Sequence, residues 1–188
     1  IEAKKLIDQF VESGSLEDKK VYLSVAKNIS GDDNFPHIQK LFLTKDEEIR
    51  KAVVTIIGNF IDDERYAAIF QKLLRSDNVP HEALKIIREK RLAQFKPVLY
   101  KIFSNMGKSL WTRYYALLAL GAFEDPSLFE LFVKGLDDES NLIKIGSLKA
   151  LSDLKDQKAV NYVKPLTKHT DDDVRSTAEF VMNYLSYS

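Results

Sequence analysis

The 188-residue sequence has no cysteine and no net charge: the first excludes cysteine chemistry, and the second removes the help of overall charge in binding polyanions, although a local basic patch could still act. Without cysteine the chain can form no disulfide, no thiolate nucleophile and no Cys-ligated metal site. Because 28 Lys and Arg residues balance 28 Asp and Glu residues, the overall charge gives no long-range attraction to nucleic acid or anionic lipid. No apolar run approaches the roughly 18 residues of a membrane span. The compartment stays open, with a preference for the cytoplasm.

Alternation of apolar and polar residues with a period of two is also missing, so we expect no strand. The sequence contains instead a pattern that returns about every thirty residues. A fixed period of this size is typical of a solenoid, in which copies of one supersecondary unit stack on each other. We align the copies on a basic residue and call its position column zero, which is occupied by Lys20, Arg50, Pro80, Arg113, Lys144 and Arg175, at intervals of 30 to 33 residues.

Apolar columns predict one helix in every copy. Columns plus three and plus six share a helical face, and small residues dominate them in the later repeats, which favours close packing of neighbouring helices. A second apolar segment precedes each of these helices, at residues 3–11, 35–43, 66–74, 95–103, 128–136 and 160–166. Polar turns join the two helices, and their Asp, Ser and Thr side chains can cap the second one, as at residues 44–46 and 170–173.

The sequence therefore predicts an all-α fold, a right-handed α-α superhelix of about six helix pairs. We expect a single repeat domain over residues 1–188, with repeats at 1–30, 31–61, 62–92, 93–123, 124–154 and 155–188. Solenoids need polar capping faces, and neither terminal repeat is specially polar. We therefore expect either that the array is a fragment of a longer chain or that its ends associate with something, including a second copy.

The repeats of this sequence resemble HEAT repeats in four features: the turn acid, the Val/Ile-Arg step, the small residues, and the glycines Gly58 and Gly121 at column plus eight. The resemblance is to the short form of about thirty residues found in phycobilin-lyase-like proteins. It implies a ladder of turn acids and helix bases between neighbouring repeats. Two departures predict an irregular junction: Pro80 replaces the base of the third repeat, and residues 106–108 lengthen the fourth turn.

The resemblance also suggests three activities, none of which this sequence supports strongly. HEAT-like deoxyhypusine hydroxylases hold two irons with His-Glu pairs in several repeats, whereas His81-Glu82 is a single pair here, so no metal and no cofactor are expected. HEAT-like DNA glycosylases use an aromatic cleft with a catalytic Asp, and the aromatic residues near Trp111 lack a carboxylate between residues 108 and 122. A lyase-like chaperone rests on family analogy alone.

In HEAT arrays the second helices line the concave surface, and here columns plus one, plus five and plus eight would face it. These columns contain no acid in any repeat, and they mix bases with apolar anchors. Such a mixture favours binding of a peptide or amphipathic helix with acidic and apolar features. The predicted partner-binding residues are Lys51, His81, Lys85, Arg88, Tyr114, Leu118, Ile145, Lys149 and Phe180.

The primary prediction is therefore a non-enzymatic protein-interaction scaffold or adaptor that binds its partner along the second helices. A nucleic-acid-binding protein is the alternative. A strongly curved stack would instead bury columns plus one and plus five. The acid-free stripe that these columns form along the second helices would then be a packing feature.

Overall fold

The computed structural model describes residues 2–28 and 34–186, and these residues form helices and turns without a strand. The second helices of the repeats are α2 (Leu16–Ala26), α4 (Glu47–Asn59), α6 (His81–Lys90), α8 (Leu110–Gly121), α10 (Asn141–Leu154) and α12 (Asp172–Ser186). The first helices are α1 (Glu2–Glu12), α3 (Phe35–Phe42), α5 (Glu64–Arg75), α7 (Lys96–Ser104), α9 (Phe129–Gly135) and α11 (Ala159–Val163). No helix among the described residues is both long and apolar enough to cross a bilayer.

Three of the first helices carry a turn of 3-10 helix. This turn leads into α7 and α9, as η1 (Ala93–Phe95) and η2 (Pro126–Leu128), and it follows α11 as η3 (Lys164–Lys168). The twelve α-helices of the described chain thus form the predicted pairs, which confirms the all-α repeat fold.

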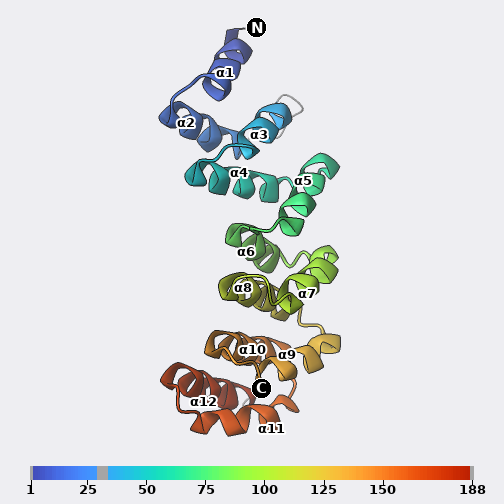
Figure 1. The fold of residues 1–188 in the computed structure, drawn as a ribbon. Coiled ribbons are helices and arrows are strands. Elements are labelled where there is room, and N and C mark those ends of the chain that lie inside the picture. The colour runs from blue at the N-terminus through green and yellow to red at the C-terminus, as the bar shows by residue number, and fades with distance from the viewer. Residues whose placement is uncertain (1, 29–33, 187–188) are drawn as a thin grey trace. The chain divides into compact units, whose positions relative to one another are not determined.

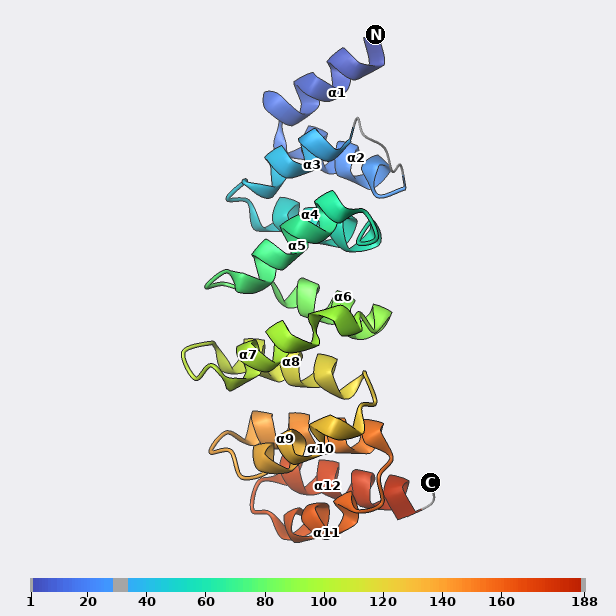
Figure 2. The ribbon, with the colours of Figure 1, turned by 90° about the vertical axis from the view of Figure 1, so that its right-hand side faces the viewer.

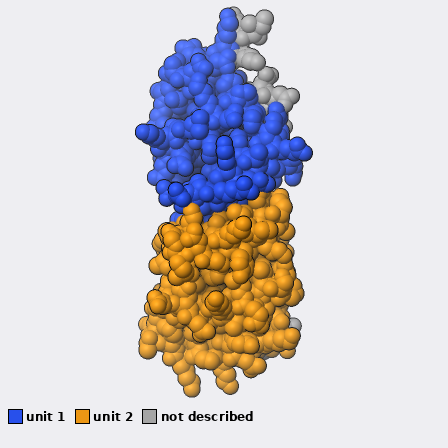
Figure 3. All heavy atoms as spheres, turned by 45° about the vertical axis from the view of Figure 1, so that its right-hand side comes forward, with its two compact units in different colours: residues 1–86 blue, residues 87–188 orange. Residues whose placement is uncertain are grey.

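The chain divides into two compact units, residues 1–86 (unit 1) and residues 87–188 (unit 2), which Figure 3 distinguishes by colour. The division falls within α6. Inside each unit, second helices pack on second helices: α2 contacts α4, and α10 lies between α8 and α12. Figures 1 and 2 show this order of pairs along each unit. The single domain stays a prediction, and the predicted boundary between residues 30 and 31 lies outside the described residues.

Side-chain caps explain where the second helices begin. The carboxylate of Asp46 accepts the amide of Ile49 at 2.9 Å, and the hydroxyl of Ser109 accepts the amide of Thr112 at 3.1 Å. Asp171 accepts the amide of Val174 at 3.0 Å. Each cap satisfies an amide that has no partner inside its helix and contributes about 1 kcal/mol. Capping at residues 44–46 and 170–173 was predicted and is confirmed.

Glycine sets the distance between second helices in unit 2. A Cβ atom added to Gly146 of α10 would lie 3.0 Å from side-chain atoms of both Leu117 and Tyr114 of α8. One added to Gly121 of α8 would lie 2.9 Å from the Cα atom of Ala150 on α10. The two helices can approach this closely only because neither position carries a side chain.

Candidate functional site

A cavity of about 380 Å³ lies on the second helices of unit 2, and we call it the second-helix cavity. Arg88 from the end of α6 lies at its edge. The other residues that line it come from α10 and α12: Lys149, Ser152, Asp153, Ser176, Thr177, Phe180 and Val181. Three of these lining side chains, Ser152, Ser176 and Thr177, are small and carry hydroxyl groups.

Phe180 is the apolar feature of the second-helix cavity. Its neighbours Val174, Ala178 and Val181 on α12 face the core and are at most 1% exposed, so helical geometry turns Phe180 to the opposite side. There it is 67% exposed. An exposed large apolar side chain beside a cavity supplies area that a partner can bury, at about 25 cal/mol per Å².

Two cations border the same cavity. The ammonium group of Lys149 donates a hydrogen bond to the hydroxyl of Tyr114 at 3.1 Å and lies 5.8 Å from the centre of that ring. Arg88 is exposed and has no hydrogen bond or ion pair with any residue that the structure describes. Both positive charges therefore remain accessible to an anionic group.

Asp153 is the acid of the cavity, and the sequence analysis did not select it. It stands at column plus nine, one residue beyond the columns taken as concave. Burial raises the pKa of the Asp153 carboxyl, and the nearby charge of Arg88 opposes that shift. The available signal was an acid that directly follows a small residue, Ser152, on a predicted second helix.

The structure corrects two predicted anchors. Tyr114 is 8% exposed and Leu118 is 5% exposed, so neither projects as an anchor for a partner. The reason is the close approach at Gly146, which brings α10 against the ring of Tyr114. The ring of Trp111 contacts the ring of Tyr114 edge to face, with the two ring centres 5.8 Å apart. For these two residues the packing interpretation of the stripe is the right one. Ile145 is partly buried.

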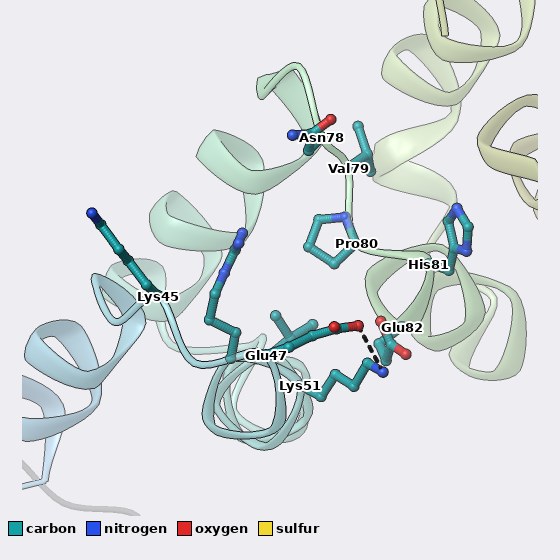
Figure 4. Close-up of a pocket in the computed structure, with 10 residues that line it drawn as sticks. Lys45, Glu47, Lys51, Asn78, Val79, Pro80, His81 and Glu82 are labelled. Atoms are coloured by element: carbon teal, nitrogen blue, oxygen red, sulfur yellow. Dashed lines mark ion pairs between the residues drawn. The ribbon is translucent and has the colours of Figure 1, made fainter. Parts of the chain in front are cut away.

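The remaining predicted residues lie in unit 1, apart from the second-helix cavity. Lys51 and His81 line a different cavity of about 410 Å³ between α4 and the turn before α6 (Figure 4). We call it the turn cavity. Lys51 forms an ion pair with Glu47 at 3.0 Å. Lys85 is exposed on α6.

The structure thus brings together Arg88, Lys149 and Phe180 of the predicted set. No three His, Asp or Glu side chains gather as potential metal ligands within residues 2–28 and 34–186. What the second-helix cavity offers is recognition chemistry: two cations, one partly buried acid, hydroxyl groups and an exposed aromatic ring.

Comparison with known proteins supports the repeat fold. Residues 97–183 match the family model described as HEAT repeats. A designed armadillo repeat protein in complex with the peptide (KR)4 is similar in structure, with a TM-score of 0.56 and 18% identity over 97% of this chain and 98% of that one. An engineered protein gives a TM-score of 0.56 at 20% identity, over 100% and 97% of the two chains.

A further similar structure is one of the computationally designed armadillo repeat proteins for modular peptide recognition. Its TM-score is 0.54 at 16% identity, over 96% of this chain and 98% of that one. Comparison with curated protein sequences found no match. At these identities the likeness establishes the fold alone: an all-α solenoid of the HEAT and armadillo type.

Proposed function

From this HEAT- and armadillo-like fold we propose that the chain is a non-enzymatic protein-interaction scaffold that binds a peptide segment along the second helices of unit 2. The observation that carries the proposal is the second-helix cavity, where Phe180 is exposed beside Arg88 and Lys149. Exposed aromatic and basic side chains around a concave site are the groups that contribute most to binding at protein interfaces.

The charges of the cavity favour an acidic segment. Arg88 and Lys149 outnumber Asp153, and burial raises the pKa of the Asp153 carboxyl because it disfavours the charged form. The designed armadillo protein noted above is in complex with a basic peptide, (KR)4. Since the fold accommodates peptides in general and the side chains select them, the opposite charge here predicts the opposite preference.

An array of synthetic peptides tests this function. Matched acidic and basic sequences, each with and without an aromatic residue, would be probed with the whole chain, and the best binders measured in solution by fluorescence polarisation. We expect acidic peptides with an apolar residue to bind and their basic counterparts to fail. Phe180→Asp should weaken binding by about tenfold or more, because it removes the apolar contact and adds a repelling charge.

Met106→Asp is the matched control. Met106 is 73% exposed, belongs to the same unit and lies in the α7–α8 turn outside the second-helix cavity. Met106→Asp should leave the affinity for acidic peptides unchanged.

Absence of any acidic-peptide binding, or equal affinity for Phe180→Asp and wild type, would refute the proposal. Stronger binding to duplex DNA, with a salt dependence that steepens by about 0.9 log units per phosphate contact, would favour the nucleic-acid alternative.

A further inference from the structure

The column-zero bases of unit 2 have partners in their turns. Arg113 donates from Nε to the carbonyl oxygen of Phe103 at 3.0 Å and from a terminal nitrogen to Asp138 of the next repeat at 2.8 Å. Lys144 donates to the carbonyl oxygen of Asp138 at 2.5 Å, and Arg175 to that of His169 at 2.9 Å. In unit 2 a base in this column therefore joins its own turn, and Arg113 joins the next repeat as well.

Arg50 occupies the same column in unit 1 and differs from these bases. It is only partly exposed, yet no hydrogen bond or ion pair joins its guanidinium group to any residue that the structure describes. It lines the turn cavity of about 410 Å³ instead. A guanidinium group has five N–H donors in a fixed fork, so a partly buried one without acceptors is unusual.

The next repeat explains why Arg50 lacks a partner. Where the fifth repeat presents Asp138 to Arg113, the third repeat presents Asn78 and Val79 to the turn cavity. Column zero of the third repeat is Pro80, which has no long side chain to occupy the space. The hydroxyl of Ser76 reaches the carbonyl oxygens of that turn, at 2.7 Å from Leu73 and 3.0 Å from Asn78.

The acids that line the turn cavity form no ion pair with Arg50 in the described structure. Glu47 forms its ion pair with Lys51, and Figure 4 shows Glu82 beside the same ammonium group. Lys51 and Arg50 are consecutive on α4, so their side chains point about 100° apart. Figure 4 shows Lys45 on the opposite side from Glu82, and Lys45 too has no ion pair with a described residue. Arg50 and Lys45 thus leave two positive charges unbalanced.

We propose that the turn cavity of unit 1 binds an oxyanion, a carboxylate or phosphoryl group carried by a ligand. The guanidinium group of Arg50 is its principal donor, and the ammonium group of Lys45 supplies the second charge. The ligand takes the place that Asp138 fills for Arg113, and Arg forks bind carboxylate and phosphate oxygens in pairs of hydrogen bonds. This site involves another unit and other residues than peptide binding, so either proposal can fail alone.

The test uses inorganic phosphate and acetate as probes. Each would be titrated into the whole ¹⁵N-labelled chain, with sodium chloride keeping the ionic strength constant, while amide shifts of residues 45–51 and 78–82 are followed by NMR. We expect saturable shifts at these residues with at least one of the anions. Saturation by phosphate alone identifies a phosphoryl ligand, saturation by acetate alone identifies a carboxylate, and saturation by both shows a site that takes either oxyanion.

Three variants decide the role of Arg50. Arg50→Gln should weaken anion binding by about tenfold, because the fork and its charge are lost. Arg75→Gln is the matched control, since Arg75 is an exposed arginine of α5 in the same unit and does not line the cavity. Asn78→Asp should also weaken binding, because it offers Arg50 an internal carboxylate without a change of shape.

The proposal is overturned if neither anion gives saturable shifts at these residues. It is equally overturned if Arg50→Gln binds the anion as wild type does. Should Arg50→Gln fail to fold, Asn78→Asp still decides, since unchanged anion binding by that variant contradicts a site at Arg50.

Discussion

Arg113 in unit 2 and Arg50 in unit 1 occupy the same column of the repeat, and the structure uses them differently. Arg113 is 4% exposed and bridges to Asp138 of the next repeat. Arg50 is partly exposed and lines a cavity. The residue type is identical, so the difference comes from the turn that follows in the next repeat. Arg113 joins two repeats because the following turn presents Asp138 to it, whereas the following turn presents Asn78 and Val79 to the cavity that Arg50 lines.

The Arg113–Asp138 pair also differs in burial from two ion pairs that join repeats in unit 1. Unit 1 joins its first two repeats with Lys20–Glu48 at 2.5 Å and Lys40–Glu12 at 2.8 Å, and all four side chains are more than a third exposed. Water and salt screen such pairs, which contribute about 0–1 kcal/mol each. The Arg113–Asp138 pair is 5% and 16% exposed, so the loss of one partner leaves a desolvated charge.

The largest expected effect is therefore on the stability of unit 2. Arg113→Ala should lower the free energy of unfolding by about 3 kcal/mol, because Asp138 and the carbonyl group of Phe103 lose their partner. Arg50→Ala should change it by about 0.5 kcal/mol or less, because no described partner is lost. Urea denaturation followed by circular dichroism measures both.

A double variant separates the ion pair from simple packing. Replacing Arg113 and Asp138 together with apolar residues of similar volume should recover much of the loss, because no unpaired charge remains. Equal costs for Arg113→Ala and Arg50→Ala would contradict the distinction between the two positions.

A second comparison uses the glycines of column plus eight, Gly58 in unit 1 and Gly121 in unit 2. A Cβ atom at Gly121 would meet the backbone of Ala150 at 2.9 Å, which can move only if two helices separate. At Gly58 it would meet side-chain atoms of Ile86 at 2.8 Å, so a partly exposed side chain, and no backbone, would have to shift.

Gly121→Ala should therefore lower the free energy of unfolding by about 2 kcal/mol. Gly58→Ala should be nearly neutral, because the gain of about 1 kcal/mol from replacing a helical glycine offsets the adjustment of Ile86. The same urea denaturation experiment ranks them. A loss at Gly58 as large as that at Gly121 would show that unit 1 packs more tightly than its side-chain contacts indicate.

The fold could be predicted because its signals are local. The period of thirty residues, the apolar columns and caps such as Asp46 each depend on residues close in the chain, and they located every helix pair. The site could be predicted only in part. Arg88, Lys149 and Phe180 follow from helical geometry, whereas the burial of Tyr114 depends on Gly146 of the neighbouring helix, which periodicity within one repeat does not reveal.

Arg50 is a second residue whose surroundings cannot be predicted from its own repeat. The sequence places it in the ladder because its own repeat has the turn acid and the base. Whether it finds a partner depends on Asn78 and Val79, about one repeat further along the chain. The residues found in a column describe one repeat at a time. A cavity, in contrast, forms between two repeats and depends on residues of both.

The smallest expected effect concerns pH, and it contrasts Asp153 with two capping acids. Hydrogen bonds from Arg65 and Lys96 lower the pKa of Asp63 in unit 1 and of Asp125 in unit 2 to about 2. The stability that these two acids contribute is present above the ordinary pKa of 3.8 and is lost as pH falls toward 2. Burial raises the pKa of Asp153 instead, so its contribution must have the opposite sign.

At pH values between 3.8 and the raised pKa of Asp153, the folded chain binds more protons than the unfolded chain. The free energy of unfolding should therefore fall as pH rises through this window, and Asp153→Asn should abolish that fall. Urea denaturation of both proteins between about pH 3 and about pH 7 measures the difference, which should grow in favour of Asp153→Asn as pH rises and then level off. A difference that stays constant with pH would place the Asp153 carboxyl in open solvent, and the second-helix cavity would then lack its partly buried acid.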